Sequence, residues 1–234
     1  MNSSLALHVQ TPAAEARVQQ IIDAATTVLG NQGYAATSMK DIAQEAGVAQ
    51  GLIHYYFGAK DDLVVAVLKQ HCERMMEESR RAFHDATGSP LARTWAVLEA
   101  ARERTASNPV MFRLFFELLP LSFTNPAIKA ELGEMYGRLT DVTIEIIEEL
   151  DKVLPCPLPI DRKEFAQVIV ASIDGIALRA AADAGADIDA MFRALSFVLI
   201  STICASYAAA GQAVPLEDVM QQLVDAMPEP VPGA

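Results

Sequence analysis

The run of residues 38–57 constrains the fold more than any other part of this sequence. Gly47 divides it into two short apolar segments, and glycine can adopt the positive φ that a sharp turn between helices requires. Ala43, four residues earlier, is small enough to let two helix backbones pass closely. Val48 and Ile53 supply apolar side chains that can hold the second segment against the first. The run therefore predicts two short helices joined by one tight turn.

This arrangement is typical of a helix-turn-helix, whose second helix can enter the major groove of DNA. Ser38 and Asp41 have the spacing of a capping box, which predicts the start of the first of the two helices. The second is expected over residues 50–57, about two turns long. DNA binding is the function that this local pattern favours.

The remainder of the chain has helical spacing without the alternating pattern of strands, so the predicted fold class is all-α. Thr11-Pro12 predicts a helix start, and Gly30 and Gly33 are expected to end that helix. A long helix is expected over 60–84. Five more are expected over 91–106, 109–123, 126–153, 161–182 and 188–212, and a short one is expected from Pro215.

These expectations divide the chain into four parts. Residues 1–13 are expected to be a flexible tail, and 14–58 a helix-turn-helix DNA-binding domain of three helices. Residues 59–227 are expected to form a helical domain for ligand binding and dimerisation. Residues 228–234 are expected to be disordered.

The charge of the chain lies mainly outside the predicted DNA-binding part. The net charge is −12, but residues 14–70 hold four basic against six acidic side chains, a net charge of −2. Because phosphate contacts supply most non-specific affinity, this balance predicts weak non-specific binding. Specific binding should then depend on backbone amides, hydroxyl groups and the avidity of a dimer.

Composition favours a cytoplasmic protein with an ample apolar core. The cysteines, Cys72, Cys156 and Cys204, are three in number and far apart, which favours reduced structural thiols. No metal site, cofactor or catalytic arrangement is expected, and no membrane partner. The most apolar run, residues 192–210, is rich in Ser, Thr and Ala and is interpreted as a buried helix.

Residues 21–69 closely resemble the TetR family of bacterial transcriptional repressors. The resemblance depends on Ile22-Asp23-Ala24-Ala25, Gly33-Tyr34, Lys40-Asp41-Ile42-Ala43, Ala46-Gly47-Val48 and Tyr55-Tyr56-Phe57, in that order. Beyond this quarter the chain matches the family only in plan. The resemblance implies a homodimer that binds a palindromic double-stranded DNA operator and is released by a small-molecule effector.

The resemblance also implies which residues contact DNA. They are Ser38, Lys40, Gln50, Gly51, Leu52, His54, Tyr55, Tyr56 and Lys60. Their chemistry agrees, since Gln50 can pair with adenine, Lys40 can donate to guanine and Leu52 can contact a thymine methyl group. Two alternatives stay open: Tyr55 and Tyr56 can be packing aromatics, and His54 can be a solvated surface residue.

Aromatic and methionine side chains on consecutive predicted helices indicate an adaptable cavity for a small apolar or amphipathic ligand. The candidate ligand-binding residues are Met76, Trp95, Met111, Phe112, Phe115, Phe116, Glu117, Tyr136 and Asp174. Asp174 interrupts an apolar helix and needs a partner, such as Arg179 or a ligand. The core of any helical domain has the same composition, so packing is the alternative interpretation.

The last two long helices are expected to form the dimer. The stretch 190–210 is apolar almost all round, which predicts burial on both sides. The candidate interface residues are Ala171, Gly175, Phe192, Leu195, Phe197 and Val198. A four-helix bundle with the symmetry mate would place two recognition helices about one turn of DNA apart, roughly 34–36 Å.

The function predicted from the sequence is therefore a DNA-binding transcriptional regulator, a repressor that a ligand releases by swinging the helix at 60–84. The alternative is a helical ligand-binding or scaffold protein with weak or no DNA binding, and an enzyme is the most distant possibility. Binding to the DNA upstream of its own gene would separate the first two interpretations.

Overall fold

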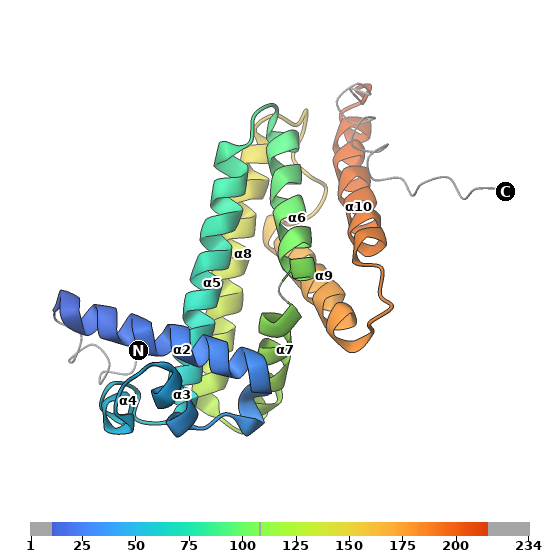
Figure 1. Ribbon diagram of the computed structural model, residues 1–234. Helices are drawn as coiled ribbons and strands as arrows, with labels where there is room; N and C mark the ends of the chain where they lie inside the picture. The colour runs from blue at the N-terminus through green and yellow to red at the C-terminus, as the bar shows by residue number, and fades with distance from the viewer. Residues whose placement is uncertain (1–10, 108, 215–234) are drawn as a thin grey trace. The chain divides into compact units, whose positions relative to one another are not determined.

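The computed structural model describes residues 11–107 and 109–214, without the side chains of residues 90, 109–111, 113, 114 and 127. The described chain divides into two compact units. Unit 1 consists of residues up to 75 together with 110–135, and unit 2 consists of 76–107 and 136–214. The expected all-α fold is confirmed within these ranges (Figure 1). The division into domains at 13/14 and 58/59 stays a prediction. Of its expected tails, 1–13 and 228–234, residues 1–10 and all of 228–234 lie outside the described residues, as does the expected helix from Pro215, whereas Pro12 and Ala13 already belong to the first helix.

Unit 1 begins with α2 (Pro12–Ala36), which Thr11 caps through its side chain, as the sequence predicted. The helices α3 (Met39–Glu45) and α4 (Gln50–Phe57) follow, and α3 packs against both α2 and α4. The other parts of unit 1 are the first half of α5 (Lys60–Asp85), most of α7 (Pro109–Leu118), η1 (Pro120–Phe123) and the start of α8 (Pro126–Asp151).

The expected end of the first helix was only partly right. Gly30 does not end α2, whereas Gly33 adopts φ 78° and ψ 172° and kinks it before one last turn. A single glycine inside a helix lowers its stability but does not stop it, and Gly33 breaks the helix because it takes a positive φ. The expected helix over 109–123 is likewise interrupted: α7 ends at Leu118, and Pro120 begins a separate 3₁₀ turn.

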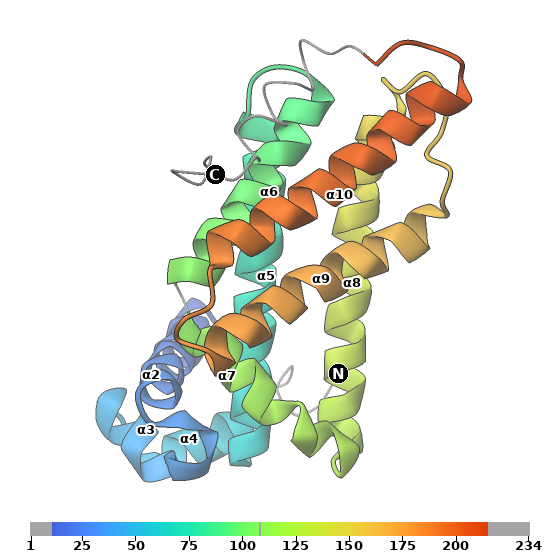
Figure 2. The same ribbon diagram turned by 90° about the vertical axis from the view of Figure 1, so that its right-hand side faces the viewer.

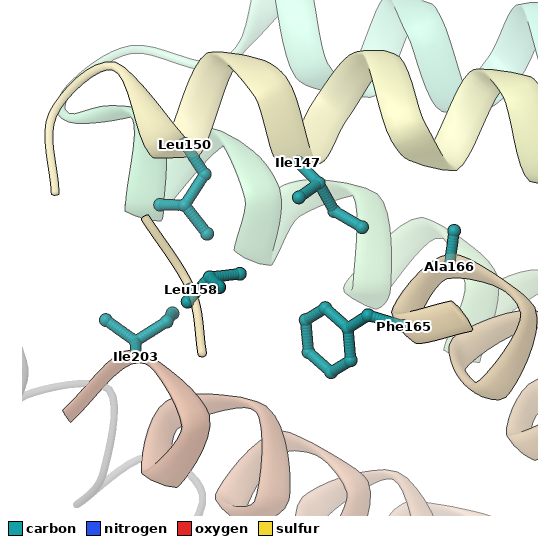
Figure 3. Close-up of a cluster of buried hydrophobic side chains, with 6 residues drawn as sticks. All are labelled: Ile147, Leu150, Leu158, Phe165, Ala166 and Ile203. Atoms are coloured by element: carbon teal, nitrogen blue, oxygen red, sulfur yellow. The ribbon is translucent and has the colours of Figure 1, made fainter. Parts of the chain in front are cut away.

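Unit 2 contains α6 (Pro90–Ser107), α9 (Arg162–Ala182), α10 (Ile188–Ala209) and the second halves of α5 and α8. The helices α6, α9 and α10 contact one another, and α9 and α10 run side by side in Figure 2. Figure 3 shows one part of the core, where α8, α9, α10 and the loop at Leu158 meet around Phe165.

By length and composition alone, α9 and α10 are apolar enough to cross a membrane, with mean hydropathy of 1.5 and 1.7. The interpretation of residues 192–210 as a buried helix holds for one face of α10 in the protomer, which carries the buried residues Phe192, Ile200 and Ile203. Phe197 and Val198 on α10 are 58% and 57% exposed in the protomer, and Val168 and Leu178 on α9 are 58% and 48% exposed. The two helices thus carry an apolar stripe, defined by these four residues, that residues 11–107 and 109–214 do not cover.

Candidate DNA-binding and ligand-binding sites

The helix-turn-helix has the local geometry that its sequence predicted. Ser38 Oγ accepts a hydrogen bond from the Asp41 amide, and the Asp41 carboxylate accepts one from the Ser38 amide, so the capping box is complete. These bonds from Ser38 hold the pKa of the Asp41 carboxyl below its usual range. Gly47 takes φ 62° in the turn. The side chains of Ile42 and Ile53 are fully buried, which fixes α3 and α4 against the rest of the unit.

The outer face of α4 is exposed. Gln50, Gly51, His54 and Tyr55 are exposed, and Leu52 and Tyr56 are half-buried. The imidazole Nδ1 of His54 lies 2.8 Å from the carbonyl oxygen of Gly58, an acceptor, so in the neutral ring Nδ1 carries the proton. The acceptor Nε2 then faces the Gln50 amide nitrogen at 3.4 Å. His54 therefore orients the amide of Gln50, the group expected to pair with adenine.

The structure does not give α4 a side-chain cap, because Ala49 occupies the cap position. Replacing Ala49 with serine should raise the free energy of unfolding by about 1 kcal/mol, since a hydroxyl group can satisfy a free amide of the first turn. Denaturant titration of both proteins measures the difference. Ser38→Ala is the opposing control and should lower stability by a similar amount, while an Ala49→Ser variant less stable than the parent would contradict the expectation.

Lys60 lies in an unexpected environment for a phosphate contact. Its ammonium group donates to the carbonyl oxygens of Tyr34 at 2.5 Å and Thr37 at 2.7 Å, and it lies 4.0 Å from the centre of the Tyr34 ring. The structure thus assigns Lys60 to the junction of α2 and α5. Its contact with DNA stays a prediction, as do those of Ser38 and Lys40, which are exposed.

A side chain of α7, Glu117, forms a hydrogen bond with the backbone at the kink of α2. The carboxylate of Glu117 accepts a hydrogen bond from the Tyr34 amide at 2.7 Å, and its two oxygens lie 3.0 Å from where a side chain on Gly33 would begin. The Tyr34 hydroxyl donates to Asp61 at 2.6 Å, and burial together with this carboxylate raises the pKa of Tyr34 to about 12. Sequence reasoning placed Glu117 in a ligand cavity and missed this contact across 83 residues of chain.

The candidate ligand-binding residues are divided between the two units. Phe112, Phe115, Phe116 and Glu117 belong to unit 1, whereas Met76, Trp95, Tyr136 and Asp174 belong to unit 2. Met76 and Phe112 are buried, and Phe115 and Phe116 pack edge to face with ring centres 5.4 Å apart. The side chain of Met111 lies outside the described part. Their contact with a ligand stays a prediction.

Within unit 2, Asp174 has the partner that its apolar surroundings require. The Tyr136 hydroxyl donates to its carboxylate at 2.8 Å, which replaces the pairing with Arg179 considered from the sequence. Arg179 instead pairs with Asp183. Burial raises the pKa of the Asp174 carboxyl above the ordinary 3.8, and the hydrogen bond from Tyr136 opposes that shift.

This shift predicts a pH-dependent effect of Asp174→Asn. A pKa raised by folding favours the folded state while the carboxyl is protonated, and that stability is lost as the pH rises through the raised pKa. The amide keeps an acceptor for Tyr136 without the buried charge. The variant should therefore be more stable than the parent at neutral pH, with the difference vanishing near pH 3.8.

Chemical denaturation across this pH range measures the effect. Glu103→Gln on the exposed face of α6 removes a carboxylate that is not buried and is the matched control. An Asp174→Asn variant that is less stable at neutral pH would mean that the charged form is favoured in the fold.

A cavity of about 340 Å³ lies between α6 and α10. Its lining consists of Trp95, Leu98, Glu99, Arg102, Asp189, Phe192, Arg193 and Ser196. The sequence prediction included only Trp95 among these as a ligand contact. The sequence does hold a pattern that could have indicated the cavity. The lining residues of each helix are spaced i, i+3, i+4 and i+7, so residues 95, 98, 99 and 102 share one face of α6, and residues 189, 192, 193 and 196 share one face of α10.

Four of the six candidate interface residues, Ala171, Gly175, Phe197 and Val198, are exposed in the protomer. Phe192 is 2% exposed and packs in the core with Leu98 and Ile176, and Leu195 packs against that core half-buried. We therefore assign Phe192 to the core of the protomer rather than to an interface.

Comparison with known protein families gives two matches. Residues 21–67 match the N-terminal model of the bacterial regulatory proteins of the tetR family, and residues 90–203 match the model of the BetI-type transcriptional repressor C-terminal domain. The two matches correspond to the DNA-binding part and to the helical part that follows it.

Individual relatives agree with these matches. The transcriptional regulator BetI of Burkholderia thailandensis is 28% identical over 73% of this chain and 85% of its own length. The transcriptional regulator HbdR of Aromatoleum sp. is 40% identical over 39% of this chain and 42% of its own. A regulator from Saccharomonospora viridis, solved in complex with choline, shares the fold with a TM-score of 0.65 at 22% identity, over 78% of this chain and 94% of that one. The chain is therefore a transcriptional regulator and belongs to the TetR family of bacterial regulatory proteins.

Proposed function

We propose that this regulator is a cytoplasmic repressor that binds a palindromic DNA operator as a homodimer and is released by a small effector. The observation that carries the proposal is the exposed outer face of α4, with Gln50, His54 and Tyr55 presented on a helix whose inner face is fully packed. A rigid helix with an exposed polar face is the arrangement that base recognition in the major groove requires.

The dimer is proposed from the apolar stripe of α9 and α10. Val168, Leu178, Phe197 and Val198 are each about half exposed or more, and the small residues Ala171 and Gly175 lie between the first two on α9. Exposed apolar side chains of this size are unfavourable in water, and a second copy of the same stripe can cover them across a twofold axis. Small residues allow the two copies of α9 to approach closely.

The effector is proposed to bind in unit 2, which contains both the described cavity and the Asp174–Tyr136 pair. Release requires only that the effector prefers the form that does not bind DNA, since a ligand shifts an equilibrium by its difference in affinity for the two states. The family relative that was solved with choline supports a small-molecule effector as the class of signal.

Selection of genomic fragments by the purified protein, followed by footprinting, tests this function. We expect protection of a palindromic sequence, with Gln50→Ala weakening binding at both half-sites. A protein that protects no sequence at low salt would instead be a helical ligand-binding protein without an operator.

A further inference from the structure

The cavity between α6 and α10 has an unusual balance of charged groups. Arg102 donates to Asp189 at 2.6 Å and to Glu99, which binds two nitrogens of the same guanidinium group. Both carboxylates that line the cavity bind this one arginine, so the three groups keep a net charge of −1, and Arg193 brings the formal charge of the lining to zero. These bonds from Glu99 and Asp189 raise the pKa of Arg102 further above its usual range, so Arg102 stays charged at any physiological pH.

The second arginine of the cavity, Arg193, lies outside this cluster of bonds. Among the described residues, Arg193 makes no hydrogen bond or ion pair, and its Nε is buried without an acceptor. A buried donor that loses water without gaining an acceptor lowers stability by about 1–3 kcal/mol, and more where the donor is charged. An acceptor that enters the cavity from outside would remove this cost.

The half-buried Trp95 adds a second donor to the lining of the cavity. Its indole Nε1 has no hydrogen-bond partner in the part of the chain that the structure describes, and an indole nitrogen can donate but cannot accept. Guanidinium groups likewise only donate. The unmatched polar groups of this cavity therefore all require acceptors, which a cationic ligand does not offer.

The remaining walls are apolar or already bonded. Leu98 and Phe192 are buried and pack in one core cluster of unit 2. The Ser196 hydroxyl donates to the Phe192 carbonyl oxygen at 2.8 Å. The cavity thus combines an apolar surface and an aromatic ring with two unmatched donors, the combination that binds an anionic group on an apolar body.

We propose that the cavity between α6 and α10 binds a small organic carboxylate, with Arg193 and the Trp95 indole N–H as donors to the carboxylate and Leu98 and Phe192 against its apolar body. The inference rests on the proposed function, because such a ligand acts as an effector only if the protein binds an operator. A carboxylate differs in charge from the choline that the Saccharomonospora viridis regulator binds.

Trp95 is the only tryptophan of the chain, so its fluorescence reports directly on this cavity. We would titrate the full-length protein with 4-phenylbutyrate, with its neutral amide, 4-phenylbutyramide, and with the cation 4-phenylbutylammonium. These probes share one apolar body and differ in charge. We expect saturable quenching by the carboxylate, and affinity at least about tenfold lower for the amide and the ammonium compound, because a charge-assisted hydrogen bond contributes about 1.5–3 kcal/mol.

Arg193→Gln should lower carboxylate affinity about tenfold or more and remove the preference for the anion. Arg81→Gln, at an exposed arginine on α5, is the matched control and should bind as the parent does. Circular dichroism checks that each variant is folded, and Trp95→Phe, followed by calorimetry, tests the indole donor separately.

Equal binding of the three probes, or an Arg193→Gln variant with unchanged selectivity, would overturn the proposal, as would no quenching by the carboxylate at millimolar concentration. Operator binding is measured separately with the same variants. A parent protein that binds its operator but not the carboxylate overturns the site alone, and a parent protein that binds the carboxylate but no operator overturns the proposed function alone.

Discussion

Replacing Phe197 with glutamate is expected to convert the protein into a monomer and to abolish tight operator binding. Phe197 is 58% exposed at the centre of the apolar stripe of α9 and α10. A twofold axis would bury two copies of the new carboxylate in one apolar interface, and each costs several kcal/mol when it is unpaired. Because half-sites bound one at a time lose avidity, operator affinity should fall about a hundredfold or more. Sedimentation velocity and gel-shift titration measure the two effects.

Val153→Glu is the matched control. Val153 is also about half exposed but lies outside the stripe, after the end of α8. This variant should remain a dimer with unchanged operator affinity. A Phe197→Glu protein that sediments as the parent does would show that the stripe is not the dimer interface.

Replacing Ile53 with alanine is expected to unfold the DNA-binding part while leaving the dimer intact. Ile53 is fully buried on the inner face of α4, and truncation of a buried isoleucine to alanine lowers the free energy of unfolding by ~2–5 kcal/mol. The helix-turn-helix is short and its α4 has no side-chain cap, so it has little stability to lose. Hydrogen exchange should show faster exchange of α3 and α4 amides, together with lost operator binding.

The matched control for this variant is Leu52→Ala, one position along the same helix. Leu52 is half-buried, so its truncation should lower stability less while it still tests the contact expected with DNA. An Ile53→Ala protein with unchanged exchange in α3 and α4 would mean that the packing of Ile53 does not hold α4 in place. The Phe197 and Ile53 variants therefore separate loss of the dimer from loss of the DNA-binding fold.

The DNA-binding part was predictable because its signals are local. A capping box, a glycine turn and the apolar side chain of Ile53 each fix a few neighbouring residues, and the structure confirms them. The starts of α5, α8 and α10 were likewise predicted correctly, at residues 60, 126 and 188. Local rules of this kind do not depend on what the rest of the chain contacts.

The site contacts were less predictable because they join distant residues. Nothing near Glu117 indicates that its carboxylate binds the Tyr34 amide, and composition alone made it a ligand candidate. Phe192 was placed in the interface because α10 is apolar all round, yet only its contacts show which side faces the core of the protomer. The cavity beside Trp95 needed two helices in a known register, which no single segment of sequence supplies.

The most direct test of the account is a footprint of the protein on a genomic fragment that it selects. We predict two protected half-sites related by a dyad, with centres one turn of DNA apart, roughly 34–36 Å. Gln50→Ala should weaken both half-sites equally, and Phe197→Glu should remove both. A single protected half-site that Phe197→Glu leaves unchanged, or uniform protection without a dyad, would contradict the account.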